Sequence, residues 1–67
     1  MDGESIILSF VPETGEISYD DLHEAVTADR ANRDVMTKFF HPMRRRGALV
    51  TRLDSSGATV KLYVSRP

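Results

Sequence analysis

The clearest periodic pattern lies in the middle of the chain. Four apolar residues recur there with the i, i+3, i+4, i+7 spacing of one helix face: Met36, Phe39, Phe40 and Met43. We predict a helix over about residues 32–46 with this stripe in the core, ended by Gly47. Pro42 lacks a backbone N–H and clashes with the carbonyl four residues earlier, so we expect the helix to kink there, or to end and restart. The opposite face carries Asp34, Thr37, Lys38, His41 and Arg45, with Arg44 on its flank.

A shorter amphipathic pattern precedes it. Ser18 is a favourable N-cap, and acidic residues in the next turns favour the positive end of a helix dipole. The apolar positions that follow share one face of a helix: Tyr19, Leu22, Ala25 and Val26. We therefore predict a helix over residues 18–26.

The C-terminal part has a period of two instead. Apolar and polar residues alternate from Leu49 to Leu53 and again from Thr59 to Val64, the pattern of β-strands. The residues between the two runs, Asp54 to Gly57, form a polar loop containing glycine, which is typical of a four- or five-residue hairpin connection. We predict a hairpin over residues 49–64, with Tyr63 on the side opposite its apolar neighbours.

The first apolar segment has two interpretations. Within residues 5–11 the apolar positions have helical spacing, but the segment is also rich in the residues that strands prefer. Pro12 ends either element. A brief extended piece is expected at residues 15–17.

Composition narrows the function classes. The chain has 67 residues, which we interpret as a single domain, 1–67. It has no cysteine, so a disulfide, a thiolate metal site and a cysteine nucleophile are excluded. No apolar run approaches the roughly 20 residues of a membrane helix, and we expect no membrane partner and a cytoplasmic location. No catalytic set or metal cluster is recognisable, so we expect neither an enzyme nor a bound cofactor.

Charge is distributed very unevenly along the chain. Residues 1–29 contain eight acidic residues and no Lys or Arg, whereas residues 30–67 contain nine Lys or Arg and two acidic residues. The two parts therefore carry −8 and +7, which agrees with the net charge of −1. Such asymmetry indicates an anion-binding face, most often for nucleic acid. The alternative is that the two halves attract each other within the fold.

The order of predicted elements resembles the winged helix-turn-helix family. Residues 17–26 look like the second helix of that family with its capped entry, and residues 43–50 look like the end of its third helix leading into a wing. Residues 6–15 then correspond to the first helix and the turn after it. The resemblance implies a minimal α+β winged helix with three short helices and the hairpin 49–64 as the wing.

The family's usual function supplies the first hypothesis. It implies a double-stranded DNA-binding protein, a small transcriptional or replication regulator, whose third helix enters the major groove while the wing touches the backbone. The positions that match the family's DNA contacts are Arg30, Arg33, Thr37, Lys38, His41, Arg44, Arg45, Arg52 and Lys61. Lys and Arg neutralise phosphates and read guanine edges. We expect a homodimer if recognition is sequence-specific, because two half-sites multiply specificity.

The second hypothesis belongs to another class. Winged-helix domains also serve as protein–protein interaction modules, for example as adaptors of a larger nucleic-acid enzyme. The acidic residues of segment 1–29 would then bind a protein partner, and Tyr63 would contribute to a contact. Charge reversal at Lys38 and Arg45 distinguishes the two hypotheses, because only DNA binding requires those cations.

Overall fold

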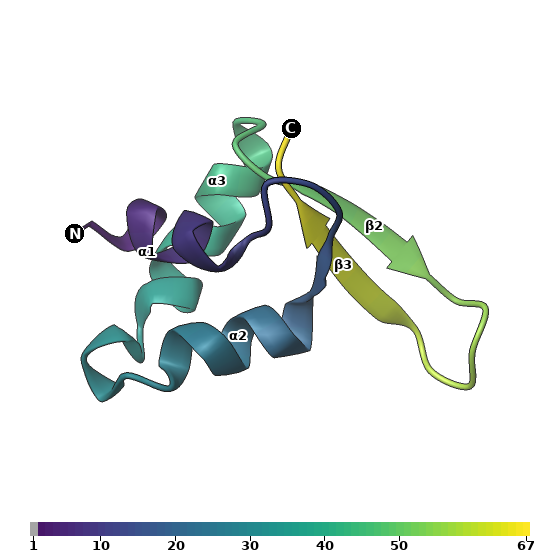
Figure 1. Ribbon diagram of the computed structural model, residues 1–67, viewed down its shortest axis with the longest axis horizontal. Coiled ribbons are helices and arrows are strands. Elements are labelled where there is room, and N and C mark those ends of the chain that lie inside the picture. The colour runs from purple at the N-terminus through teal and green to yellow at the C-terminus, as the bar shows by residue number, and fades with distance from the viewer. Residues whose placement is uncertain (1) are drawn as a thin grey trace.

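The computed structural model describes residues 2–67 and consists of three helices beside a small sheet (Figure 1). The elements in chain order are α1 (Gly3–Phe10), β1 (Ile17–Ser18), α2 (Tyr19–Thr27), the 3₁₀ turn η1 (Arg30–Asn32), the π-helical turn η2 (Met36–Phe40), α3 (His41–Arg45), β2 (Val50–Asp54) and β3 (Lys61–Ser65). Because η2 and α3 are continuous, and residue 35 is already helical, we call residues 35–45 the third helix.

The segment with two interpretations is a helix. The Asp2 carboxylate accepts a hydrogen bond from the Ser5 N–H at 2.8 Å and so caps the start of α1. Ile7 is fully buried, and Ile6 and Leu8 are partly buried against the core. Val11, which precedes Pro12, has the extended backbone that proline imposes on its neighbour, and this ends the helix.

The second helix follows the prediction closely. Ser18 is its N-cap, and its hydroxyl accepts a hydrogen bond from the Asp21 N–H at 3.1 Å. The helix occupies Tyr19–Thr27 and buries Leu22 and Val26. The apolar period therefore identified the correct face.

The third helix is shorter than the predicted range 32–46. The Asp29 side chain caps the separate turn η1, which occupies the first residues of that range. The helical backbone continues through Pro42, but the helix type changes beside it, which agrees in part with the predicted end and restart: the wider η2 turn ends at Phe40, and Pro42 lies in the first turn of α3. Gly47 ends it with φ of +82°, a conformation that favours glycine.

The sheet has three antiparallel strands in the order β1–β3–β2. The extended piece predicted at residues 15–17 lies slightly later, as β1, and adds a strand beside β3. The hairpin is confirmed, but its loop is longer than predicted because β3 begins only at Lys61. The Asp54 carboxylate accepts hydrogen bonds from the Ser56 N–H at 2.9 Å and the Ser56 hydroxyl at 2.6 Å, which stabilises a turn directly after β2.

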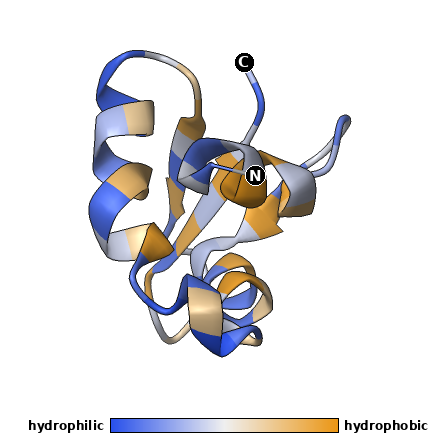
Figure 2. Cartoon of the chain, turned by 90° about the vertical axis from the view of Figure 1, so that its left-hand side faces the viewer, coloured by the Kyte–Doolittle hydropathy of each residue, from blue (hydrophilic) through white to orange (hydrophobic). Residues whose placement is uncertain are grey.

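The core lies between the helices and the base of the hairpin. In Figure 2 the hydrophobic segments face the centre of the molecule. The stripe of the third helix contributes to it as predicted, with Met36, Phe40 and Met43 buried and Phe39 packed at its edge. The core residues are Ile7, Val11, Leu22, Val26, Val35, Met36, Phe40, Met43, Leu49 and Val64. This α+β arrangement is compatible with a winged-helix-like fold.

The far end of the hairpin extends beyond the helices (Figure 1). As a result Leu53 and Val60, which belong to the predicted apolar alternation of the hairpin, are 70% and 65% exposed. Only the base of the hairpin, at Leu49 and Val64, reaches the core. Within residues 2–67, no helix is both long enough and apolar enough to span a membrane.

Candidate nucleic-acid interface

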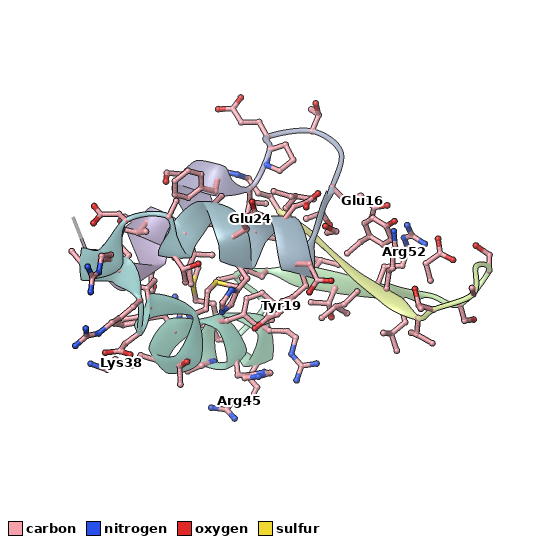
Figure 3. The ribbon with its side chains drawn as sticks, turned by 90° about the horizontal axis from the view of Figure 1, so that it is seen from below. Glu16, Tyr19, Glu24, Lys38, Arg45 and Arg52 are labelled. Atoms are coloured by element: carbon pink, nitrogen blue, oxygen red, sulfur yellow. The ribbon has the colours of Figure 1, made fainter. Side chains whose placement is uncertain are left out.

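The outward face of the third helix carries the central group of candidate residues. On its inward side Phe40 packs in the core. The Phe40 ring lies edge-on to the Tyr19 ring, with 5.0 Å between ring centroids, and edge-on to the His41 ring, with 5.6 Å between centroids. The opposite side is exposed and presents Thr37, Lys38, His41, Arg44 and Arg45. Figure 3 shows Lys38 and Arg45 projecting from one edge of the molecule, away from Glu16 and Glu24.

Two further candidates lie before this helix. Arg30 begins η1 and Arg33 follows it, and both are exposed. Arg33 has a long contact of 3.9 Å with the carboxylate of Asp34, its neighbour in sequence. Asp34 therefore pairs with Arg33, whereas a pair with Lys38 four residues later is not formed among the described residues.

On the hairpin, Arg52 is held by its own chain. Its Nε lies 3.2 Å from Glu16 Oε2, and its Nη1 lies 3.8 Å from Asp54 Oδ2. The guanidinium also stands over the Tyr63 ring, 4.8 Å from the centroid, as a cation–π contact. These interactions partly neutralise the Arg52 charge within the chain, so its attraction for a phosphate is weakened.

The same pair shifts two pKa values in opposite directions. The hydrogen bond from Arg52 lowers the pKa of Glu16, and this hydrogen bond raises the pKa of Arg52. The pKa of Asp54 is lowered mainly by its hydrogen bonds from Ser56. Both carboxylates are therefore ionised throughout the neutral range, and Arg52 remains a bound cation. Lys61, the other hairpin candidate, is exposed and faces Asp54 across the two strands.

Two arginines outside the candidate DNA-binding set, Arg46 and Arg66, have structural contacts. Arg46 forms an ion pair with Glu4 of α1. Arg66 donates hydrogen bonds to the carbonyl oxygens of Leu8 at 2.6 Å and Val11 at 3.2 Å. These carbonyls end α1, so Arg66 supplies donors that the helix itself lacks there. No local pattern reveals these contacts, since each joins distant parts of the chain.

Apart from Arg33, whose contact with Asp34 is long, the basic residues divide into two sets. Arg46, Arg52 and Arg66 are bound to other parts of the same chain. Within residues 2–67, no ion pair involves Arg30, Lys38, Arg44, Arg45 or Lys61. Both sequence interpretations of the charge asymmetry thus describe part of the molecule: some cations join the two halves, and others remain exposed, mainly along one helix.

The described residues contain no group of three or more His, Asp or Glu side chains placed to hold a metal ion. His23 lies on α2 beside Tyr19, with a ring separation of 6.1 Å. Comparison of the chain with known protein families, with curated proteins and with solved structures finds no match.

Proposed function

We propose that this protein is a winged-helix domain that binds double-stranded DNA through its third helix. The observation that carries the proposal is the set of exposed, unpaired cations on the outward face of that helix: Lys38, Arg44 and Arg45. The helix is anchored in the core by its opposite side, so these side chains are presented on a rigid element. A helix with one side in the core and cations on its exposed side fits the major groove of B-DNA, which is about 12 Å wide.

Each side chain on this face has a definable role. Lys38 and Arg45, with Arg44 beside them, neutralise phosphates and release counterions, which provides affinity without reading sequence. Thr37 and His41 lie between them and are placed to contact base edges or thymine methyl groups. Arg30, one turn before the helix, adds a further phosphate contact.

The wing has a smaller part in this proposal than the family resemblance implies. Arg52 is held by Glu16 and Tyr63, and Lys61 faces the carboxylate-bearing Asp54 across the two strands. Carboxylates repel phosphates, so the hairpin side of the molecule is a poor surface for the DNA backbone. We therefore assign DNA affinity to the third helix and to Arg30, and not to Arg52 or Lys61.

The test is the salt dependence of binding to a 30-base-pair duplex of random sequence, measured by fluorescence anisotropy. Four phosphate contacts predict a log–log slope of roughly −3 to −4. Lys38→Gln/Arg45→Gln should reduce the slope by about 2 and weaken binding by roughly 100-fold at low salt.

The matched control is Ser5→Glu/Thr14→Glu, which changes the net charge by the same amount at exposed positions outside the third helix. Its slope should stay at the wild-type value. Equal weakening by both double variants would mean that only net charge matters, and absence of binding by the folded wild-type protein at low salt would refute the proposal.

The competing hypothesis is a protein-binding module that uses the acidic surface of α2. It is favoured by Asp20, Asp21 and Glu24, which are exposed and form no ion pair within residues 2–67. A partner bound there would tolerate Lys38→Gln/Arg45→Gln and would be lost on Asp21→Lys/Glu24→Lys. The two pairs of substitutions therefore give opposite results under the two hypotheses.

A further inference from the structure

The strand β2 forms an open edge of the sheet. The strand order β1–β3–β2 leaves one side of β2 without a neighbouring strand, and among the helices and strands of residues 2–67 only β3 packs closely along it. Natural edge strands are commonly protected by a proline, by a bulge or by being very short. β2 has five residues, contains no proline and pairs with β3 residue by residue from Val50 to Asp54 without a bulge. Its unpaired N–H and C=O groups can therefore accept a further strand.

The side chains along this edge lie on two faces of the sheet. Leu53 shares a face with Leu62, which is directly opposite it on β3, and Leu53 is 70% exposed. Arg52 and Asp54 are its neighbours in β2, so they lie on the other face. Their side chains are 52% and 32% exposed although they contact each other. The open edge thus carries an apolar group on one face and both a cation and an anion on the other.

The order of these three side chains matches a second copy of the same strand. When two copies of β2 run antiparallel with Leu53 opposite Leu53, Arg52 of each copy lies opposite Asp54 of the other. Residues directly opposite each other share a face, so the two charge pairs form on one face and the leucines meet on the other. Centring the pairing on Arg52 or Asp54 would place like charges together, and centring it on Thr51 would leave both charges opposite apolar residues. An edge that complements itself in this way fits a two-fold interface.

The position of Leu53 also keeps the helices of two copies apart. β2 runs outwards from the core, and the far end of the hairpin extends beyond the helices (Figure 1). Antiparallel pairing centred on Leu53 therefore places the two helical parts at opposite ends of a shared sheet. A strand of uniform charge would meet a like charge at either Arg52 or Asp54, so another protein of that kind fits this edge less well.

We propose that the open edge of β2 is the interface of a symmetric homodimer of this chain. The two sheets join into one antiparallel sheet in the order β1–β3–β2–β2–β3–β1. Backbone hydrogen bonds connect residues 52–54 of the two copies, the Leu53 side chains contact each other, and Arg52 of each copy forms an ion pair with Asp54 of the other. The dimer covers Leu53, the most exposed large hydrophobic residue in residues 2–67. None of these residues is among those assigned to DNA affinity, so the association is tested without DNA.

The mass of the protein in solution, measured by sedimentation equilibrium over a range of concentrations, tests the proposal. The wild-type protein should change from 7.5 kDa to twice that mass as concentration rises. Leu53→Glu should remain monomeric, because two carboxylates would face each other at the two-fold axis. Val60→Glu is the matched control: Val60 is 65% exposed and precedes β3, so the substitution adds the same charge to the hairpin but not to β2, and the dimer should persist.

A mixing experiment tests the register of the two strands. Arg52→Glu alone or Asp54→Lys alone should raise the dimer Kd by at least roughly tenfold, since residues 52 and 54 then carry like charges. An equimolar mixture of the two variants should dimerise again, because in the mixed dimer both positions carry opposite charges. Circular dichroism confirms that each variant retains its fold.

Hydrogen exchange of the β2 amides gives a readout that side-chain packing alone would not change. Successive residues of a strand direct their N–H groups to alternate sides, so at least one of residues 52–54 directs its N–H away from β3. Exchange of that amide should become slower as the concentration of the wild-type protein rises. In Leu53→Glu it should not depend on concentration.

Three results would overturn the proposal. The wild-type chain could remain at 7.5 kDa up to millimolar concentration. Leu53→Glu could leave the dimer unchanged, or Val60→Glu could abolish it equally, and either result would place the interface elsewhere. The mixture of Arg52→Glu and Asp54→Lys could fail to dimerise, which would exclude pairing centred on Leu53.

Discussion

The third helix and the hairpin contain the same kinds of residue but use them in opposite ways. On the third helix the apolar side chains are buried and the cations are exposed without partners. On the hairpin the cation Arg52 is bound by Glu16, whereas Leu53 and Val60 are exposed. Residue type therefore does not decide burial or charge pairing in this chain. Distance from the helical core decides the first, and the position of the nearest carboxylates decides the second.

The largest expected difference is in the free energy of unfolding when one apolar side chain is removed from each region. Phe40 is 1% exposed and contacts Tyr19, so Phe40→Ala should lower the free energy of unfolding by about 3–5 kcal/mol. Leu53→Ala should change it by less than about 0.5 kcal/mol at low protein concentration. Urea denaturation followed by circular dichroism measures both. Similar losses would show that the hairpin tip is part of the core.

Alanine substitution of two glycines compares the packing of α1 against the third helix with the packing of the hairpin loop. A Cβ at Gly3 would overlap the Phe39 ring, so Gly3→Ala forces α1 and the third helix apart. We expect a loss of about 1–3 kcal/mol, typical of overpacking. At Gly57, in the hairpin loop, the nearest atom to a new Cβ is the Thr59 carbonyl oxygen at 4.0 Å. Gly57→Ala should therefore leave the thermal midpoint unchanged, and a comparable drop in both variants would contradict the contrast.

Bound and free arginines provide a smaller test. Arg66 donates to two carbonyl oxygens at the end of α1, so Arg66→Gln should cost about 1 kcal/mol of stability. Arg45 has no intramolecular ion pair among residues 2–67, and Arg45→Gln should not alter stability measurably. Denaturation midpoints of the two variants at the same pH give the comparison. A larger loss for Arg45→Gln would reverse the division into bound and free cations.

The smallest effect is the pH dependence of the hairpin contacts. The pKa of Glu16 is below its ordinary value of 4.5 in the folded state because Arg52 hydrogen-bonds its carboxylate. The stability from this pair is therefore present above about pH 4.5 and is lost as pH falls through the lowered pKa. Urea midpoints at pH 6 and pH 3 should differ less in Glu16→Gln than in the wild-type protein. Arg45→Gln should keep the full wild-type difference.

Features set by near neighbours were predictable from the sequence alone. The period of the apolar residues located α2, the buried side of the third helix and the hairpin, and Ser18 marked the start of α2 correctly. These features depend on hydrogen bonds and side-chain spacing within about four residues. The exposed side of the third helix follows from the same spacing, and Thr37, Lys38, His41, Arg44 and Arg45 are all exposed.

The tertiary structure alone decided the remaining features. Segment 3–10 is a helix because its residues pack against the third helix, which its own ambiguous period could not reveal. The partners of the bound arginines lie far away in sequence: 42 residues for Arg46 and Glu4, 36 for Arg52 and Glu16, and 58 for Arg66 and Leu8. A local pattern carries no information about such pairs, because only the folded arrangement brings them together. The exposure of Leu53 and Val60 has the same origin, since alternation identifies one face of a strand but not how far the strand extends beyond the core.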